Sequence, residues 1–527
     1  MKFQYFLMLI GITFLSECPS GDAYRILGLF PLHGKSHFIM CNYLMKTLAA
    51  RGHQVDVVSH FPLEKPVANY TDINISGSLP QIVNNLPFDV IQQFSSIDLT
   101  YLTNIAGLDI CRLMDHPEIQ KIIRNPPQDP PYDLVIHEMF AAECYLAFGH
   151  HLKVPVVGII TSVLFPWLNE PMGNPSNPAF VPSPFSDFQL PMTFWQRVKN
   201  VFMENMMTYS FRKNTEIQNE IVKKHFGPDA PTVRELERNI SLILVNSHFS
   251  FNNPRPLTPA VVEVGGLHLQ GDDGLEFSPD LKKWLDEADD GFIFFSLGSM
   301  ARFETFPREI IEVFYEAFRK VAPVRILMKI AKKEDLPAGV PENTMILPWL
   351  PQTKVLKHKN IKAFISHGGL GSVQESLYYG VPLIGMPLFG DQIINIDHCA
   401  RKKLAVPIDY ATVDQKILTE AISTILHDPT YRDNMKKVSK LFQDRPTNPL
   451  DLAVYWVEYV IRNGNVLRSP ALDLEWWQVA LIDVYAFFFS CVAVVVFLIA
   501  MILRLLYGKL LAPRSTAGNR DQGKKRQ

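Results

Sequence analysis

The chain has 527 residues, and its 51 Lys and Arg nearly balance its 53 Asp and Glu, for a formal net charge of −2. This balance argues against a protein that binds nucleic acid through its phosphates, which would carry a basic face, and 47% hydrophobic with 20% charged residues excludes a disordered chain. Six cysteines are too few for a disulfide scaffold, and without CxxC or Cys/His spacing they predict neither a zinc site nor thiol redox chemistry.

The N-terminus, residues 1–23, has the pattern of a secretory signal peptide. Lys2 precedes an apolar run from Phe6 to Leu15, and small or polar residues follow.

The next residues predict a buried strand from Arg25 to Phe30, a helix with apolar residues on one side, and a second strand from Gln54 to Ser59. Such a βαβ unit indicates a parallel sheet.

Strands and helices continue to alternate in two halves of the chain. Further strands are expected at 133–136, 154–160, 292–296, 325–330, 345–348, 361–366 and 383–386. Residues 253–274 are rich in Pro and Gly and are interpreted as a linker between an N-terminal domain, residues 24–252, and a C-terminal domain, residues 275–445. The fold class predicted is α/β, with ligands bound beyond the C-terminal ends of parallel strands.

The C-terminal part predicts a single-pass membrane anchor. Residues 446–483 are expected to hold a returning helix and a juxtamembrane segment. Val484 to Leu503 is an uncharged run that is long enough to cross ~30 Å of hydrocarbon. The tail, residues 504–527, is basic, and the positive-inside rule assigns it to the cytosol and the rest of the chain to the lumen.

Two short motifs agree with a luminal chain. Lys524 and Lys525 match the dilysine retrieval signal of endoplasmic-reticulum membrane proteins. Asn69, Asn74 and Asn239 begin N-glycosylation sequons. We therefore expect a type I protein of the endoplasmic-reticulum membrane with luminal domains.

The second half contains a candidate nucleotide-sugar site. The strand 361–366 runs into His367-Gly368-Gly369 and then a helix, and glycines at such a turn expose backbone N–H groups to an anion. Trp349 follows a strand upstream, and Asp391-Gln392 begins a helix downstream. An aromatic face for a base, an anion-binding turn and a carboxylate–amide pair for sugar hydroxyls would together hold a nucleotide sugar.

These residues resemble a family signature. Trp349 through Gln392 is similar to the motif of UDP-glycosyltransferases, and the signal peptide, anchor and dilysine tail resemble the membrane-anchored animal branch, glucuronosyl- and glucosyltransferases, in its insect-like form. The resemblance implies a GT-B fold of two Rossmann-like domains facing a cleft. It implies the acceptor in the N-terminal half and the UDP-sugar in the C-terminal half.

The resemblance also implies roles for individual donor-site residues. Trp349 would stack on the uracil, and Gln352 and Glu375 would hold the ribose. Ser299, His367 with Gly368 and Gly369, and Ser372 would meet the diphosphate, Asp391 and Gln392 the sugar, and Arg255 would reach the donor from the linker. Gly371 departs from the family, where many members carry Asn.

The N-terminal half holds a candidate general base. Ser36-His37-Phe38 resembles the family's Ser-His-Trp, so His37 would take the proton of the acceptor hydroxyl. His33 lies close in sequence but fits the family alignment less well. The family pairs this histidine with an Asp after a strand, and this chain has Glu138 at that position, either as the partner of His37 or as a surface carboxylate.

The expected reaction needs no bound metal or other cofactor. The chain lacks the Asp-x-Asp metal motif of the other large glycosyltransferase fold, and direct displacement would invert the anomeric carbon to give a β-glycoside. UDP-sugar is then a co-substrate. Glucose is favoured over glucuronic acid, and the oligomeric state, homo- or hetero-oligomer, stays open.

The acceptor is expected to be a small lipophilic molecule, such as a phenol, steroid or xenobiotic, in keeping with detoxification. The stretch from Phe165 to Trp195, rich in aromatic residues and Met, either lines an apolar pocket or packs as ordinary core or membrane-facing surface.

Two other classes were weighed. A nicotinamide-dependent oxidoreductase would show GxGxxG in its first turn, which reads His33-Gly34-Lys35-Ser36-His37. A catalytically silent UDP-sugar-binding membrane protein is the remaining alternative, because Glu138 departs from the family pattern.

Overall fold

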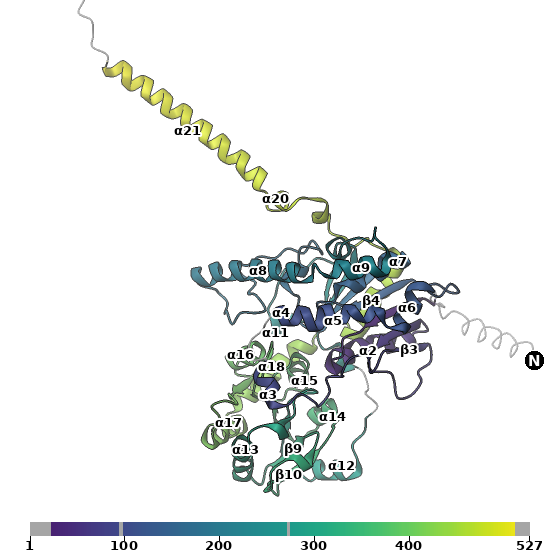
Figure 1. The fold of residues 1–527 in the computed structure, drawn as a ribbon. Helices are drawn as coiled ribbons and strands as arrows, with labels where there is room; N and C mark the ends of the chain where they lie inside the picture. The colour runs from purple at the N-terminus through teal and green to yellow at the C-terminus, as the bar shows by residue number, and fades with distance from the viewer. Residues whose placement is uncertain (1–22, 94–98, 271–274, 512–527) are drawn as a thin grey trace, which may run out of the picture. The chain divides into compact units, whose positions relative to one another are not determined.

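The computed structural model describes residues 23–93, 99–270 and 275–511. Its contacts divide the chain into two units, one up to Ser469 and one from Pro470 onward. The first unit holds two parallel sheets, each with helices on both faces (Figure 1). This confirms the predicted α/β class. The expected signal peptide and dilysine signal lie outside the described residues.

The first sheet has seven strands in the order β3-β2-β1-β4-β5-β6-β7. In that order they are Tyr70–Asn74, Gln54–Ser59, Arg25–Phe30, Leu134–Glu138, Val156–Ile160, Ile240–Val245 and Val261–Glu263. The central strand β1 is buried on both faces: Leu27 and Leu29 belong to one core, and Ile26 and Phe30 to the other. Such two-sided burial is typical of parallel sheets.

One face of this sheet is covered by α2 (Lys35–Ala50) together with α19 (Pro449–Asn463). The helices that contribute to the core of the other face are α4 (Leu99–Leu102), α5 (Asp109–Arg112), α6 (Pro117–Arg124), α7 (Ala147–Leu152), α8 (Phe194–Thr215), α9 (Gln218–Phe226) and α10 (Val233–Glu237). Helix α19 follows the second domain in sequence, yet Val454 and Val457 pack in the core beneath α2. The chain therefore returns to the first sheet after the second one is complete.

The second sheet has six strands in the order β10-β9-β8-β11-β12-β13. In that order they are Thr344–Leu347, Arg325–Lys329, Phe292–Ser296, Ile361–Ser366, Leu383–Gly385 and Ala405–Pro407. One face packs against α13 (Arg308–Lys320) and α17 (Gln415–His427). The helices of the other face are α11 (Phe249–Asn252), α12 (Pro279–Asp286), α14 (Gln352–Lys357), α15 (Leu370–Tyr379), α16 (Gln392–Arg401) and α18 (Pro429–Gln443).

Two segments differ from the sequence interpretation. The expected linker, residues 253–274, contains β7, which pairs with β6 as the last strand of the first sheet. Strand β7 is formed around Val261 and Val262. The Pro and Gly residues around this pair had indicated only a connecting segment. Helix α3 (Phe88–Gln93) precedes most of the first domain in sequence, yet it lies among the helices of the second domain (Figure 1).

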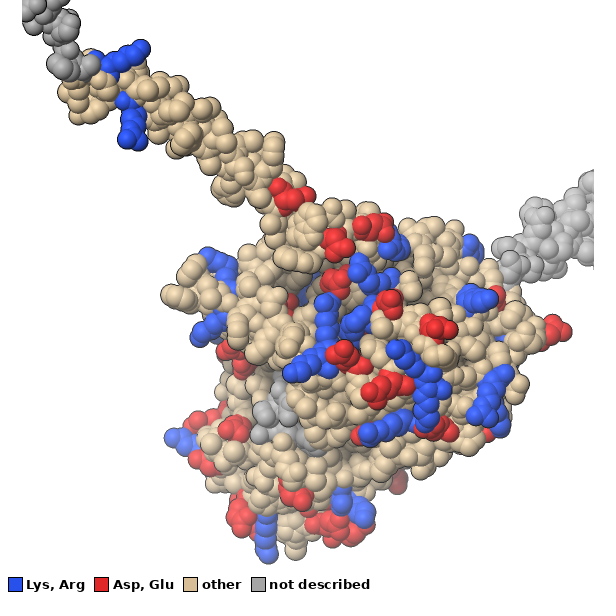
Figure 2. Space-filling view, turned by 45° about the horizontal axis from the view of Figure 1, so that its top comes forward, with Lys and Arg blue, Asp and Glu red and all other residues tan. Residues whose placement is uncertain are grey.

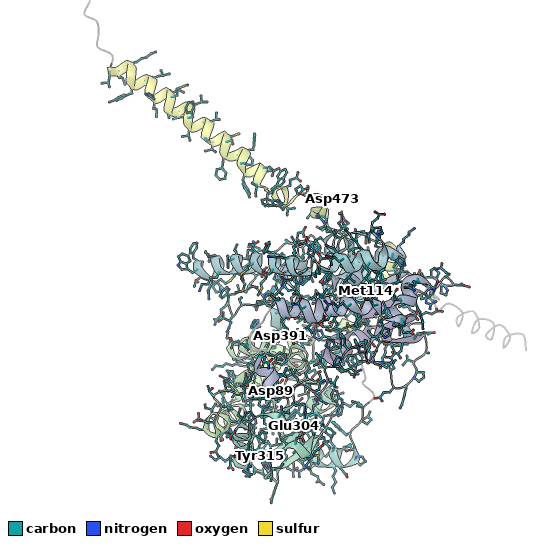
Figure 3. All side chains as sticks on the ribbon, in the orientation of Figure 1. Asp89, Met114, Glu304, Tyr315, Asp391 and Asp473 are labelled. Carbon is teal, nitrogen blue, oxygen red and sulfur yellow. A yellow bond between two sulfur atoms is a disulfide. The ribbon has the colours of Figure 1, made fainter. Side chains whose placement is uncertain are left out.

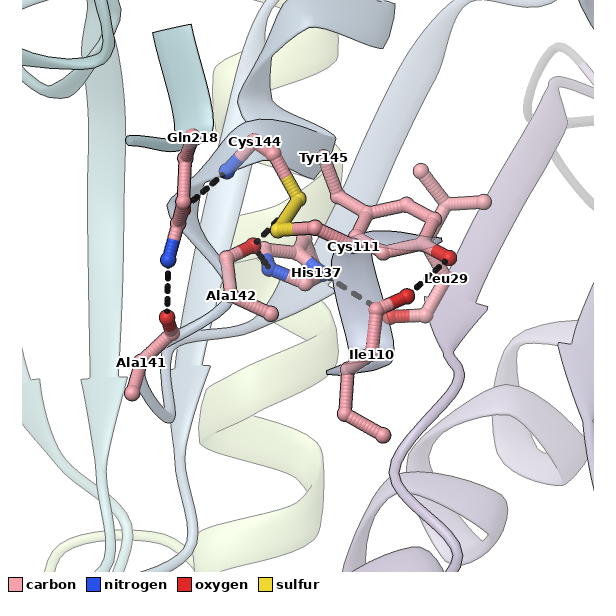
Figure 4. Close-up of a disulfide and its surroundings, with 9 residues drawn as sticks. All are labelled: Leu29, Ile110, Cys111, His137, Ala141, Ala142, Cys144, Tyr145 and Gln218. Carbon is pink, nitrogen blue, oxygen red and sulfur yellow. Dashed lines mark hydrogen bonds between the residues drawn. A yellow bond between two sulfur atoms is a disulfide. The ribbon is translucent and has the colours of Figure 1, made fainter. Parts of the chain in front are cut away.

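A disulfide joins Cys111 of α5 to Cys144, 33 residues later, with their Cα atoms 6.1 Å apart (Figure 4). Around it, Gln218 accepts a hydrogen bond from the Cys144 N–H and donates one to the Ala141 carbonyl. The sequence predicted no such bond, because the two cysteines have no characteristic spacing. The fold alone brings the loop after β4 against α5.

The second unit consists mainly of α20 (Trp476–Val479) and α21 (Ile482–Leu511). The apolar part of α21 has a mean hydropathy of 3.0, and none of its residues is buried in the protein. Figure 2 shows an uncharged middle, with Lys and Arg only toward its C-terminal end. The helix is thus long and apolar enough to cross a membrane, and it includes the predicted span from Val484 to Leu503.

Candidate functional site

The first part of the site lies at the start of α2. His37 is in the first turn of this helix, and its Nδ1 lies 2.7 Å from Glu138 Oε1 at the end of β4. Thr161, just after β5, donates its hydroxyl to Glu138 at 2.7 Å, and its Oγ1 lies 2.8 Å from His37 Nδ1. Because β1, β4 and β5 are neighbours in a parallel sheet, their C-terminal ends bring these side chains together.

The surroundings of His37 make its imidazole more basic. Burial by itself would lower the pKa, but the charge and hydrogen bond of Glu138 and the charge of Asp391 together raise the pKa of His37 above its usual value. The Phe140 ring packs edge-on against the imidazole, with centroids 4.6 Å apart. Since Glu138 engages Nδ1, Nε2 is the ring nitrogen left for a substrate proton.

His33 has a different environment, although it is only four residues away. It is buried, and its ring packs edge-on against His60 with centroids 6.1 Å apart. Burial lowers the pKa of His33. Among the described residues, its Nδ1 is buried without a hydrogen-bond partner, and no carboxylate pairs with the ring as Glu138 does with His37.

The turn after β11 forms a tight cradle around His367. Gly298 follows the neighbouring strand β8 with a φ of +80°, and a Cβ on it would come within 2.5 Å of the imidazole. A Cβ on Gly369 would come within 2.7 Å of His367 Nε2. Only glycine therefore fits at either position without displacing the ring, and Ser299 continues the same loop at the end of β8.

His367 is a neutral hydrogen-bonding group in this cradle. Burial and, to a lesser extent, the charge of Lys329 lower its pKa to about 4. Its Nδ1 is buried and has no hydrogen-bond partner in the part of the chain that the structure describes. The adjoining Gly368 has a φ of +82°, which turns the backbone sharply into α15. A neutral imidazole beside backbone N–H groups at a helix start suits an anionic ligand.

Four side chains meet beside this turn. The Gln352 amide donates hydrogen bonds to the Ser372 hydroxyl, at 3.2 Å, and to Glu375. His268 lies in the connection between the two domains, and its Nε2 is 3.3 Å from Glu375 Oε1. Ser372 is therefore grouped with Gln352 and Glu375 rather than with His367.

Trp349 presents an aromatic surface next to this cluster. The side chain is 39% exposed. Lys329, the last residue of β9, holds its ammonium 4.6 Å from the centroid of the Trp349 ring. The Lys329 ammonium thus covers one face of the indole. The opposite face is the one on which a flat ligand would stack.

Asp391 and Gln392 stand at the start of α16, where they have different surroundings. Asp391, labelled in Figure 3, borders the cleft, and its carboxylate accepts a hydrogen bond from Asn395 at 2.9 Å. Limited hydration raises the pKa of Asp391. Gln392 is buried, and its carbonyl oxygen accepts from the N–H groups of Leu388 and Phe389. Gln392 thus supports its own loop.

A cleft of about 730 Å³ contains Asp391 and Arg255 among its lining residues. It lies between the Ser183–Phe188 loop of the first domain and α16 of the second. Arg255 also borders an adjoining hollow of about 310 Å³, and its Nε is buried without a hydrogen-bond partner. The Asp391 charge raises the pKa of His37, so the predicted base is coupled electrostatically to the predicted sugar-binding residue of the other domain.

The aromatic stretch expected as an acceptor pocket divides into two groups. Trp167 is buried and stacks on Phe165 and Phe211, with ring centroids 4.7 and 4.1 Å away, as part of the core. Phe188 instead lines the cleft. Ordinary packing therefore accounts for Trp167.

Thr161, Lys329, His268 and Asn395 belong to the site but carry no motif that pointed to them in the sequence. Thr161 and Lys329 lie at strand ends where inspection of each strand's last residues would have found them. The described residues contain no group of three or more His, Cys, Asp and Glu arranged to hold a metal ion. The side chains of Asn69, Asn74 and Asn239 are exposed.

Comparison with known proteins agrees with this geometry. Residues 113–516 match the family model described as UDP-glucoronosyl and UDP-glucosyl transferase. The chain is 37% identical over 508 residues to UDP-glucosyltransferase 2 of Dactylopius coccus, covering 95% of this chain and 96% of that protein. It is 30% identical over 525 residues to UDP-glucuronosyltransferase 2B30 of Macaca fascicularis, covering 95% and 96%.

Solved structures show the fold. The glycotransferase of kitacinnamycin matches with a TM-score of 0.55 and 17% identity, over 83% of this chain and 99% of that one. CalG4, the calicheamicin glycosyltransferase, matches with a TM-score of 0.55 and 18% identity, over 84% and 100%. These similarities confirm the predicted GT-B fold.

Proposed function

The chain belongs to the family of UDP-glucuronosyl and UDP-glucosyl transferases, and we propose that this UDP-glycosyltransferase inverts the anomeric carbon as it transfers glucose from UDP-glucose to a hydroxyl of a small lipophilic acceptor. The contact between His37 and Glu138, with Asp391 nearby across the cleft, carries this proposal. A base and a sugar-binding carboxylate are the two groups that such a transfer needs close together.

In the proposed step, His37 Nε2 takes the proton of the acceptor hydroxyl as the oxygen attacks the anomeric carbon. The C–O bond to UDP breaks on the opposite face, and UDP leaves with the bonding electrons. The product is a β-glycoside from an α-linked donor. Glu138 stabilises the imidazolium and holds its tautomer, while Thr161 fixes the Glu138 oxygen that contacts the ring.

The donor is assigned to the loops of the second domain. Trp349 stacks on the uracil, and Gln352 and Glu375 hold the ribose. His367, Ser299 and the backbone at Gly368 and Gly369 receive the diphosphate. Ser372, whose hydroxyl accepts a hydrogen bond from Gln352, keeps its own O–H to donate to the diphosphate. Arg255 supplies a positive charge from the connection between the domains, and its buried Nε, which has no hydrogen-bond partner among the described residues, supports that role. Asp391 contacts the sugar through its carboxylate. Gln392 does so through its amide nitrogen, because its oxygen is held by the N–H groups of Leu388 and Phe389. These groups offset the negative charge that develops on departing UDP.

Glucose is preferred over glucuronic acid for two reasons. The relative at 37% identity is named a UDP-glucosyltransferase, whereas the glucuronosyltransferase from Macaca fascicularis is 30% identical. Asp391 at the sugar position accepts hydrogen bonds from neutral hydroxyls, while a sugar carboxylate beside it would meet a like charge.

We further propose a type I protein of the endoplasmic-reticulum membrane, anchored by α21. The Cys111–Cys144 disulfide supports a luminal location, since disulfides persist in oxidising compartments. The exposed side chains of the three sequon asparagines agree with it. The sequence-based domain limits, 24–252 and 275–445, are retained, with β7 inside the proposed connection.

The test uses microsomes that contain the full chain. We expect UDP release from UDP-glucose only when a phenolic acceptor is present, with a product that a β-glucosidase cleaves. A higher kcat/KM with UDP-glucuronic acid would reverse the choice of sugar, and an α-glycoside would contradict inversion. UDP-sugar binding without transfer to any of a broad acceptor panel would favour the silent-binder alternative.

A further inference from the structure

A segment of the first domain reaches across to the donor loops. We call residues 82–93 the arm. At its start, the Ile82 N–H donates to the His33 carbonyl, and Ile82 forms a parallel bridge with Gly34, the residue that precedes α2. The arm therefore begins against the loop that leads into the helix of His37.

Two residues later the arm pairs with the loop after β8. The Asn84 N–H donates to the Ser299 carbonyl at 2.8 Å, and the Leu86 N–H donates to the Met300 carbonyl at 3.0 Å. The Arg302 N–H donates back to the Leu86 carbonyl. These bonds attach the arm to the backbone of the loop assigned to the diphosphate.

The end of the arm belongs to the second domain's core. Ile91 is fully buried there, and the Phe88 ring packs against Phe306 with centroids 4.6 Å apart. Figure 3 shows Asp89, on the same short helix, among side chains of the second domain. Because both ends are held, the arm forms a fixed bridge between the two domains.

One side chain joins the arm to the donor site. The Lys329 ammonium donates to Asn84 Oδ1 at 2.9 Å and to the Gly298 carbonyl at 2.6 Å, while it lies against the Trp349 ring. A Cβ on Gly298 would come within 2.5 Å of the imidazole of His367, so the backbone of this loop lies close to that ring. Lys329 thus contacts both the loop assigned to the diphosphate and the Trp349 ring assigned to the uracil.

From these contacts we propose that Asn84 and Lys329 are a positioning pair for the donor: Asn84 orients the Lys329 ammonium, which holds the Gly298 loop and the Trp349 ring in the arrangement that receives UDP. The inference rests on the proposed donor site. According to this proposal, Asn84 of the acceptor domain affects nucleotide binding although it does not contact the nucleotide.

The test measures UDP binding to the detergent-solubilised full chain by calorimetry. Asn84→Ala and Lys329→Met should each raise the Kd of UDP about tenfold or more, since hydrogen bonds to charged groups are the stronger class. The KM for UDP-glucose should rise in step, with kcat nearly unchanged, because the support acts on ground state and transition state alike. Asn84→Asp keeps the acceptor oxygen and should retain tight binding.

The matched control is Asn85→Ala. Asn85 is exposed on the same arm, and within the described residues its amide donates only to the Gln81 carbonyl. The Kd of UDP for Asn85→Ala should therefore equal that of the wild type. An equal loss in Asn85→Ala, no recovery in Asn84→Asp, or wild-type affinity in folded Asn84→Ala would each overturn the pair. If the wild type itself binds no UDP, the proposed donor site fails instead.

Discussion

His37 has two carboxylates within electrostatic reach, Glu138 in its own domain and Asp391 in the second domain. Glu138 stands where the family usually has Asp, and its extra methylene raised the question whether it could reach the imidazole. The 2.7 Å contact at Nδ1, supported by Thr161, answers the question of reach. The catalytic role of the pair stays a prediction.

His37→Ala should lower turnover about 10²- to 10⁴-fold, the usual cost of removing a general base, with UDP binding nearly unchanged. Glu138→Gln removes the charge that stabilises the imidazolium and should also be slow. Since the two residues act as a unit, the double variant should be barely slower than His37→Ala. His33→Ala is the control, and a comparable loss there would make His33 a second candidate base.

The pH dependence of kcat/KM gives a separate readout, because its acidic limb reports the base of the free enzyme. Glu138 and Asp391 raise the pKa of His37 above 6.5, so activity should rise with pH through a midpoint above 6.5. In Glu138→Gln the midpoint should move to lower pH while the plateau falls. A midpoint that stays fixed would remove Glu138 from the titration of this group.

His367 and Asp391 are predicted to act on different parts of the donor. His367→Ala should weaken binding of UDP itself, because a hydrogen-bonding group for the diphosphate is lost. Asp391→Ala should bind UDP normally but turn over UDP-glucose slowly. Calorimetry with UDP and steady-state kinetics distinguish these outcomes, and an equal loss of UDP affinity in both variants would contradict the division.

At the scale of the element, the start of α15 combines a filled and an open position. A Cβ on Gly369 would press on the His367 ring, whereas a Cβ on Gly371 would have no atom within 4 Å. The open space lies where many family members carry Asn. Nothing in the packing of the helix therefore prevents a side chain at position 371.

We expect Gly371→Asn to fold normally and to lower the KM for UDP-glucose severalfold, since an amide donor is added at an anion-binding helix start. Gly371→Ala should be neutral. Gly369→Ala is the matched contrast: it should displace His367 and weaken UDP binding. Equal effects of the two alanine variants would show that the cradle does not constrain His367.

The arm is the second element with consequences beyond its own contacts. It is a short stretch that pairs at one end with the loop before α2 and at the other enters the core of the second domain. Its sequence shows no strong periodicity. The position of the arm follows from the surfaces that both domains offer, which explains why it was not predicted.

At the scale of the whole molecule, the membrane topology can be tested directly. If α21 spans the membrane with the domains in the lumen, protease added to intact microsomes should remove only the basic tail, residues 504–527. Detergent should make the large domains accessible. Digestion of the domains without detergent would contradict the topology.

Much of the fold and part of the site follow from the sequence alone. The strands at 25–30, 54–59, 292–296 and 361–366 coincide with β1, β2, β8 and β11, because continuous apolar runs between turn signals are typical of buried parallel strands. Trp349, His367 and Asp391 were singled out because they follow a strand or begin a helix, and the family resemblance gave them their roles and pointed to His37. Local pattern is sufficient where the chemistry sits at the end of a strand or the start of a helix.

Only the tertiary structure decided the rest. The pairing of Cys111 with Cys144, the return of α19 beneath α2, and the bond from Lys329 to Asn84, which is 245 residues away in sequence, join segments that carry no mutual signal in the chain. The same holds for Trp167. As a residue type, a tryptophan is compatible with an acceptor pocket or with a core position, and only its stacking on Phe165 and Phe211 shows that it belongs to the core. Periodicity reports which face of an element is buried, but the partner that buries it is determined by packing between distant segments.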